Sequence, residues 1–363
     1  MSRNQRIGAN QVVTLQALLG IELPIIQAPM AGVQDSRLAV AVSNAGGLGS
    51  LPCAMLNPDA MRTELAHIAA HTTQPYNVNF FCHTPPTPSA EREAGWRALL
   101  APYYRELGLD LSAIPAGLSR APFGTEAADV LDDFKPAVVS FHFGLPPAEL
   151  LARVRAGGSK IFSSATTVDE AQWLEAHGVD AIIAQGFEAG GHRGMFLSDD
   201  LSTQVGTFAL LPQIVQAVAI PVVAAGGIAD AKGVAAAMAL GAAGVQVGTA
   251  YLLCPEATTS AVHKAALRSE AARHTAVTNL FSGRPARGIV NRLMRELGPV
   301  STAVPDFPLA ASALAPLRGK AEGQHRGDFS PLWSGQNASG CREITAAELT
   351  RGLAPTHAAP SRT

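Results

Sequence analysis

The chain has 363 residues, of which 47% are hydrophobic and 15% charged, and its formal net charge is -2. So balanced a charge gives no electrostatic footprint for nucleic acid or for an acidic membrane surface, and we expect binding to neither. The length allows one large domain, because α/β barrels regularly exceed the usual domain size. Strands buried on both faces would account for a composition this rich in apolar residues.

The cysteines and the chain start bear on the cellular compartment. Cys53, Cys82, Cys254 and Cys341 lie far apart and show neither a CxxC pair nor the Cys/His spacing of a zinc site. This pattern favours a reducing compartment without a metal centre. The start, MSRNQRIGANQVV, has no apolar core of signal-peptide type, and prolines, glycines and charges interrupt the most apolar long region, 214–254. We therefore expect a cytoplasmic protein that does not span a membrane.

Eight short runs rich in apolar and β-branched residues recur along the chain, each followed by a glycine, proline or polar stop. They cover residues 24–30, 48–54, 76–82, 137–143, 160–166, 181–186, 221–227 and 244–252. Helical patterns lie between them, at 36–45, 58–71, 146–156, 168–177, 206–219 and 230–241. Eight alternating units predict an α/β fold of the (β/α)8 TIM-barrel type, with a parallel sheet and right-handed crossovers.

The barrel is predicted for residues 20–255, and two stretches of the chain do not fit its repeat. Residues 83–135 are an insertion after the third strand, rich in proline and aromatic residues, which we expect to fold over the barrel mouth. Residues 256–353 are a C-terminal extension that we expect to pack on the barrel as a lid. Helical patterns in this extension lie near 259–272 and 287–296. The last residues, 354–363, have the composition of a disordered tail.

The glycine-rich loop after the sixth strand is the first candidate for chemistry. It belongs to the stretch AIIAQGFEAGGHRG, residues 181–194. Gly190 and Gly191 let the backbone come close to a ligand, and His192 is the one side chain there whose ordinary pKa suits proton transfer near neutral pH. From this loop alone, an incidental surface histidine is an equal alternative. The assignment therefore depends on the other strands.

Polar side chains end several other strands. In a barrel of this type the ligand site lies at the C-terminal ends of the strands, and strand side chains alternate between faces. In the fourth strand, Val139, Phe141 and Phe143 would form the outer face, and Ser140 and His142 the inner one. The residues that the alternation directs toward one mouth are Asn79, His142, Gln185 and Gln246. A buried amide that only satisfies backbone groups is the alternative for each.

Glycines after the last two strands indicate a phosphate site. The seventh strand ends in AAGGIAD, with Gly226 and Gly227 before a helix, and the eighth contains GVQVGTA, with Gly248 and Thr249. Backbone amides and a helix N-terminus bind an anion without needing lysine; tight turns alone are the alternative. Walker A, HExxH, GxGxxG and serine-elbow motifs are absent from the sequence. A mononucleotide is therefore expected, and FMN is the natural candidate.

Six motifs together resemble the nitronate monooxygenases, formerly called 2-nitropropane dioxygenases. They are PIIQAPMAGV (24–33), NVNFFCHTPP (77–86), SFHFGLP (140–146), AQGFEAGGHRG (184–194), AAGGIAD (224–230) and VQVGTAYL (245–252). The second and third are similar to class I members of the family, and the resemblance extends through FSGRPARG (281–288) and PLWSGQNA (331–338). It implies a TIM barrel with non-covalently bound FMN.

The resemblance also implies roles for individual residues. His192 would be the catalytic histidine and His142 a second pocket histidine, while Met30 would lie against the flavin ring. The other flavin-binding residues would be Asn79, Gln185, Gly190, Gly191, Gly226, Gly227, Gln246, Val247, Gly248 and Thr249. No metal site is implied.

The implied activity is FMN-dependent oxidation of alkyl nitronates by O2, which gives a carbonyl compound and nitrite. Propionate 3-nitronate would be the physiological substrate, and the protein would be a monomer or homodimer. An NAD(P)H-dependent FMN reductase of quinones or enoyl thioesters is the alternative enzyme, because its motifs are similar. A barrel that binds FMN or a phosphate without turnover is an alternative from another class.

Overall fold

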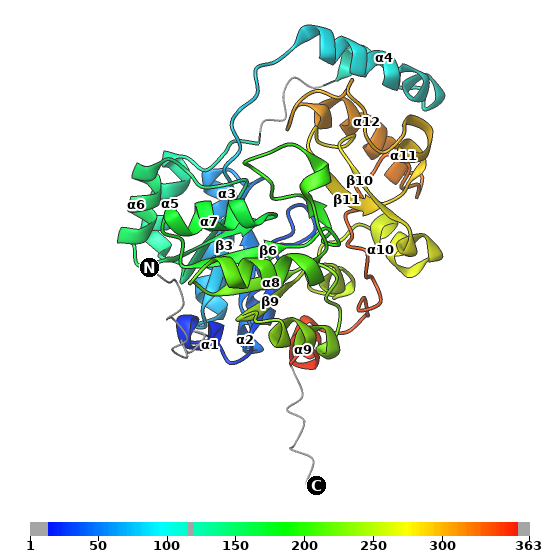
Figure 1. The fold of residues 1–363 in the computed structure, drawn as a ribbon. Helices are drawn as coiled ribbons and strands as arrows, with labels where there is room; N and C mark the ends of the chain where they lie inside the picture. Colours follow the sequence, from blue (N-terminus) through cyan, green and yellow to red (C-terminus); the bar gives the residue numbers. More distant parts are fainter. Residues whose placement is uncertain (1–13, 115–119, 355–363) are drawn as a thin grey trace, which may run out of the picture.

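Eight parallel strands form the centre of the computed structural model, which describes residues 14–114 and 120–354 (Figure 1). The strands are β1 (Ile25–Gln27), β2 (Gly49–Pro52), β3 (Tyr76–Phe81), β4 (Val138–His142), β5 (Lys160–Ala165), β6 (Ala181–Gln185), β8 (Val222–Ala225) and β9 (Gly244–Val247). Their order in the sheet is β1-β9-β8-β6-β5-β4-β3-β2, and a parallel bridge between Ile26 and Leu48 joins the two ends. The sheet closes into the barrel that the sequence predicts.

Helices surround this barrel, and several of them begin after a residue whose side chain caps them. The surrounding helices are α2 (Ser36–Asn44), α3 (Pro58–His71), α5 (Thr125–Phe134), α6 (Ala148–Ala156), α7 (Val168–Ala176), α8 (Thr207–Ala217) and α9 (Ala231–Ala239). Asp230, for example, accepts the backbone N–H of Gly233 at 2.8 Å, which satisfies a donor that the first helical turn leaves free. Helix α8 has no side-chain cap of its own. Instead, Glu188 in the loop after β6 accepts the N–H of Thr207 at 2.7 Å, which ties that loop to α8.

The alternation of strand side chains separates two cores. Outward residues such as Val139 and Phe141 pack against the helices, and inward residues such as Val138 and Ile183 fill the lower barrel. The short helix α1 (Leu15–Leu19) adds Leu15 to this inner core. Full burial of one such aliphatic side chain contributes roughly 1.5–3 kcal/mol. The lower barrel is mostly apolar, although Asn77 lies in register with Val138 and its Nδ2 donates to Oγ of Ser50 at 3.0 Å.

The predicted face of Phe143 is wrong. This residue follows the end of β4 with a positive φ of 70°, so the strict alternation of the strand no longer applies to it. Its ring packs at the barrel mouth with Phe81 and Phe307.

The insertion and the C-terminal extension meet above the barrel in Figure 1, where α4 lies beside α12. Elements of the insertion before α5 are α4 (Ala90–Glu106) and the 3-10 turn η1 (Leu111–Ala113). Trp96 and Tyr104 of α4 donate to the carbonyls of Ala310 and Ala313, at 3.2 and 2.6 Å. Both side chains belong to a separate apolar cluster shared with the extension. Two segments far apart in the sequence therefore build one lobe.

The remaining elements lie in the β6–α8 connection and after β9. They are β7 (Gly191–His192), η2 (Leu201–Thr203), η3 (Thr249–Leu253), α10 (Ala261–Arg268), η4 (Glu270–Arg273), β10 (Thr275–Thr278), β11 (Ala286–Ile289), α11 (Arg292–Leu297), α12 (Ala310–Glu322) and α13 (Ala346–Gly352). The helix expected over 287–296 is therefore wrong in its first half. Strand β11 replaces it, because antiparallel pairing with both β10 and β7 overrides local propensity. Residues 355–363 of the expected tail lie outside the described residues.

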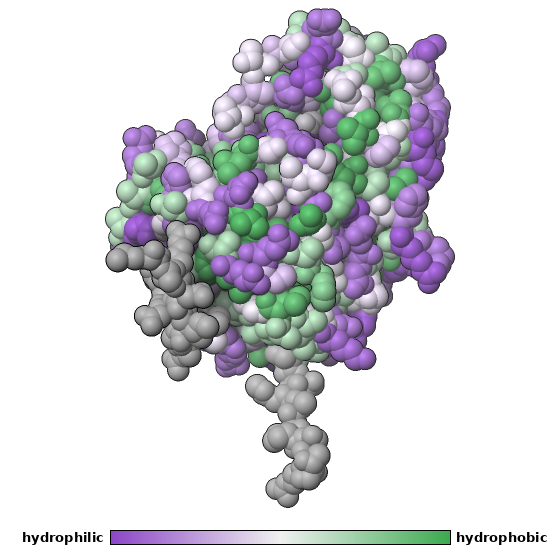
Figure 2. Space-filling view, viewed as in Figure 1, coloured by the Kyte–Doolittle hydropathy of each residue, from purple (hydrophilic) through white to green (hydrophobic). Residues whose placement is uncertain are grey.

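Hydrophobic and hydrophilic side chains are mixed over the face seen in Figure 2. The most exposed large apolar side chain among the described residues is Phe208, at 76% exposed. Within residues 14–114 and 120–354, no helix combines the length and the apolar character needed to cross a bilayer.

Candidate active site

A pocket opens among the C-terminal ends of the barrel strands and encloses about 1270 Å³, open mouth included. The predicted site residues that line it are Met30, Asn79, His142, Gln185, Gly190, Gly191, His192, Gly226, Gly227, Gln246, Gly248 and Thr249. Val247 is the exception. It is only 1% exposed and packs in the core between strands and helices, because its neighbour Gln246 takes the inward position. Val247 could therefore meet a ligand only through its backbone.

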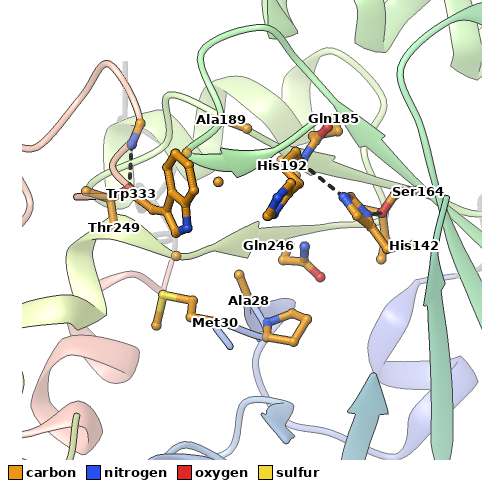
Figure 3. A pocket seen from close by; sticks show the side chains of 18 of the residues that line it. Ala28, Met30, His142, Ser164, Gln185, Ala189, His192, Gln246, Thr249 and Trp333 are labelled. Atoms are coloured by element: carbon orange, nitrogen blue, oxygen red, sulfur yellow. Dashed lines mark hydrogen bonds between the residues drawn. The ribbon is translucent and has the colours of Figure 1, made fainter. Parts of the chain in front are cut away.

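His192 is held in place by the C-terminal extension as well as by the barrel. Its two-residue strand β7 pairs with β11, with His192 opposite Ala286. The carbonyl of His192 accepts two hydrogen bonds, from Nε2 of Gln185 at 2.9 Å and from Nε2 of His142 at 3.1 Å. Figure 3 shows His192 between Trp333 and Met30 on one side and His142 and Ser164 on the other. The loop carrying His192 is thus fixed from three directions.

The buried side chain of Arg193 holds the backbone of the same loop. Its side chain is fully buried and donates to the carbonyls of Gly186 and Gln185, at 2.7 and 2.8 Å, and to Oε1 of Gln204 at 3.0 Å. Burial, together with the charge of Arg287, lowers the pKa of Arg193 to about 10, so the side chain stays cationic at neutral pH. A buried cation satisfied by three oxygens fixes the loop backbone just before His192 turns into the pocket.

The imidazole of His192 is neutral at pH 7 and has one nitrogen engaged. Burial is the largest cause that lowers the pKa of His192 well below its usual value, and the positive charge of Arg120 adds to this effect. Nε2 lies 2.8 Å from Oγ of Ser282. The Ser282 hydroxyl can donate to the carbonyl of Arg284 at 3.3 Å, which favours Nε2–H as the donor to Oγ. In this tautomer Nδ1 is the unprotonated nitrogen, able to accept a proton.

His142 has a different environment, because both of its ring nitrogens already have protein partners. Nε2 must carry the hydrogen, since the His192 carbonyl can only accept it, and Nδ1 lies 3.0 Å from Oγ of Ser164. Burial lowers the pKa of His142 to about 4, more than its hydrogen bond to the His192 carbonyl raises it. His142 is therefore neutral at pH 7, and its hydrogen bonds act on the loop that carries His192.

Replacement of Ser282 by alanine should release Nε2 of His192. We expect the pocket histidine to sample both tautomers and more than one ring orientation, which lowers kcat about 10-fold, near the scale of one lost hydrogen bond. Stopped-flow or oxygen-uptake rates, measured on protein whose ligand content is checked by absorbance, test this. The exposed Ser269→Ala variant is the control. An unchanged kcat and pH profile in Ser282→Ala would show that this contact does not orient the ring.

The glycines at the other end of the pocket shape a cradle for an anion. Gly226 and Gly227 have positive φ angles of 116° and 74°, which favour glycine. A Cβ on Gly226 would lie 2.9 Å from Oγ1 of Thr207. The segment 333–337 covers this region, and Nδ2 of Asn337 in it donates to the carbonyl of Gly227 at 2.9 Å. The loops after β8 and β9 and one strap of the extension therefore meet here.

The lining fits a ligand with a flat apolar body, a polar edge and an anionic tail. Met30 and Trp333 supply apolar surface beside the glycine cradle. Oε1 of Gln246 is buried and has no hydrogen-bond partner among the described residues. A buried acceptor of this kind needs a donor from a bound group. Over the described ranges, no set of three or more His, Cys, Asp or Glu side chains is grouped for a metal ion.

Several site residues were not found from the sequence. Ser282 and Trp333 lie in FSGRPARG and PLWSGQNA, which carry the resemblance without indicating a role. Arg120 lies in the insertion, where no repeat or strand end marks it. Ser164 occupies the inner face at the end of β5, so the alternation that gave His142 could have found it.

Comparison with protein families gives one match over almost the whole chain. The sequence model of the family described as nitronate monooxygenase matches residues 13–355. A curated relative from Paraburkholderia phytofirmans, named nitronate monooxygenase, is 44% identical over 346 residues, which cover 93% of each chain. Another with the same name, from Pseudomonas aeruginosa, is 42% identical over 341 residues, or 93% of this chain and 96% of the relative.

Two solved structures share the fold of this chain. The crystal structure of a nitroalkane oxidase from Streptomyces ansochromogenes superposes with a TM-score of 0.85 at 39% identity, over 93% of this chain and 96% of that one. FabK from Thermotoga maritima has a TM-score of 0.67 at 28% identity, over 93% of both chains.

Proposed function

The chain belongs to the nitronate monooxygenase family and is an oxidoreductase, and on this basis we propose that it binds FMN in the barrel pocket and oxidises alkyl nitronates with O2. The products would be a carbonyl compound and nitrite, and propionate 3-nitronate would be the physiological substrate. The observation that carries the proposal is the placement of a neutral His192 and a glycine cradle in one pocket.

The chain's own residues would bind the flavin along the length of the pocket. The backbone around Gly226, Gly227 and Gly248 would hold the phosphate. Met30 would lie against the ring, and the free Oε1 of Gln246 would accept a hydrogen bond from its polar edge. When bound, FMN supplies the redox chemistry, taking electrons from the substrate and passing them to O2.

His192 and His142 would have separate roles. Nδ1 of His192, unprotonated in this tautomer, would accept the carbon-bound proton when the substrate is a neutral nitroalkane. His142, with both nitrogens engaged, would be a positioning residue rather than a catalytic one. The aromatic rings of Phe81 and Trp333 in the lining exclude water from the reacting atoms.

An absorbance spectrum of the purified protein, followed by anaerobic titration, tests this function. We expect a flavin spectrum, bleaching on addition of propionate 3-nitronate, and oxygen uptake with release of nitrite when air is admitted. A colourless protein that does not take up added FMN would contradict the proposed cofactor.

The reductase alternative has one observation in its favour, the likeness of GGHRG (190–194) and AAGGIAD (224–230) to motifs of FMN-type reductases. It requires a nicotinamide site and predicts that NADH or NADPH bleaches the flavin quickly while the nitronate does not. That result would replace the proposed activity with a reductase activity. A flavin that responds to neither compound would favour the non-catalytic barrel.

A further inference from the structure

One wall of the pocket carries a cation that has no counter-ion among the described residues. Arg120, in the part of the insertion shortly before α5, is half-buried and lines the pocket. Among the described residues, no hydrogen bond or ion pair to its guanidinium is found, and the charge that acts on it, Arg318, is also positive. Burial lowers the pKa of Arg120, yet an arginine stays protonated in proteins. A partly buried, unpaired cation at a ligand-accessible surface is suited to an anionic group of the ligand.

Aromatic rings place this cation near His192. The guanidinium carbon of Arg120 lies 5.7 Å from the centroid of the Phe307 ring. The same ring lies 5.4 Å from the His192 ring, between centroids. Arg120 and His192 therefore both lie beside the Phe307 ring, and both line the pocket.

Among the described residues, the charges that act on His192 are all those of basic groups. The groups that shift its pKa are Arg120, His142, Arg284 and His83, and none is a carboxylate. Arg284 already donates to the carbonyl of Met195 and is influenced by Asp199 and Glu170. Because both pocket histidines are neutral, Arg120 is the one residue with a formal charge among the described residues that line the pocket.

His83 lies close to the backbone of Arg120. Its ring is 4% exposed, stands edge-on to Phe307 at 4.8 Å, and neither ring nitrogen makes a hydrogen bond of standard geometry. Burial lowers the pKa of His83, more than the adjacent backbone of Arg120 raises it. His83 is thus a neutral packing partner and does not take the place of Arg120 as the anion-binding group.

We propose that Arg120 forms a distal anion subsite that binds a carboxylate at the end of the substrate opposite the nitronate group. Arg120 would then be the specificity-determining residue that favours nitronates with an acidic tail over those with an alkyl tail. This inference rests on the proposed function, because it assumes that a nitronate lies beside His192. A guanidinium pairs with a carboxylate through two parallel hydrogen bonds, which a lysine cannot reproduce.

Steady-state kinetics with two substrates of equal length test the subsite. For the FMN-loaded Arg120→Met enzyme, kcat/KM for propionate 3-nitronate should fall about 10- to 100-fold, mainly through KM, the scale of a lost charge-assisted hydrogen bond. For propane-1-nitronate, whose tail is uncharged, it should change less than about 2-fold. Arg120→Lys should recover part of the loss, and Arg97→Met, at an exposed position on α4, is the matched control. Equal losses with both substrates would place Arg120 at the nitronate itself, and no loss with either would remove it from recognition.

Binding measurements separate this inference from the proposed activity. Succinate has the shape of propionate 3-nitronate with a carboxylate in place of the nitronate, and butanoate is the matching analogue of propane-1-nitronate; neither is readily oxidised. Calorimetric titration of the holoenzyme should give about 10-fold or tighter binding of succinate, lost in Arg120→Met. If the wild type oxidised neither nitronate but kept this preference, the proposed function would fail while the subsite stood. Equal binding of the two acids by wild type and variant would overturn the subsite.

Discussion

Replacement of His192 by asparagine should leave a yellow protein that turns over its substrates poorly. Asparagine is close to histidine in size, so β7 and its pairing with β11 should persist and the FMN content should not change. A base that removes a carbon-bound proton contributes about 10²–10⁴-fold, and we expect a loss in this range with nitroethane. With ethyl nitronate, which is already deprotonated, the loss should be smaller, about 10-fold, because no proton has to be removed and only the positioning of the substrate is affected. Oxygen-uptake rates divided by flavin content measure both.

The pH profile checks the same role in the wild type. The pKa of His192 is lowered well below its usual value, so the neutral form that accepts a proton persists as the pH falls through 6.5. We therefore expect kcat/KM with nitroethane to stay level from pH 8 to below 6.5 and to fall only in more acidic solution.

The control for the His192→Asn variant is His71→Asn, at an exposed position at the end of α3. Loss of FMN from His192→Asn would mean that the histidine holds the cofactor.

The barrel was predictable because its signals are local. Each strand is a short apolar run with a marked stop, and the period of two assigns inner and outer faces without any knowledge of neighbours. This is why Asn79, His142, Gln185 and Gln246 were found from four separate strands. The same rule placed Val139 outside correctly and failed only at Phe143, where the chain leaves the strand with a positive φ.

What could not be predicted depends on contacts between distant segments. Ser282 reaches His192 across 90 residues of sequence, and β11 forms because β7 and β10 lie on either side of it. Nothing in the composition of 286–289 indicates those partners. Arg120 has meaning only beside Phe307 and His192, which other parts of the chain deliver. Arg193 was visible next to His192, but its full burial under the loop was not.

These long-range contacts make the site depend on the insertion and the extension as well as on the barrel. The extension supplies the strand that pairs with β7 and the strap over the glycine cradle, and the insertion supplies Arg120. The barrel ends alone would present the histidine and the glycines on an open rim. We infer that substrate selection resides in the added lobe, while the anion cradle belongs to the barrel and can be tested there.

Replacement of Gly227 by valine should remove FMN from the protein. Gly227 has a φ of 74°, where a β-branched residue is strained by about 1–3 kcal/mol, and its carbonyl holds Asn337 of the strap. A branched side chain here would also occupy space at the cradle, so we expect FMN affinity to fall at least about 100-fold, measured by flavin-fluorescence quenching. Gly20→Val is the matched control, because Gly20 has nearly the same φ, 72°, with no atom within 4 Å of an added Cβ. If both variants kept FMN while Gly227→Val folded normally, the phosphate would have to bind elsewhere in the pocket. If both lost it, backbone strain and not the cradle would be the cause.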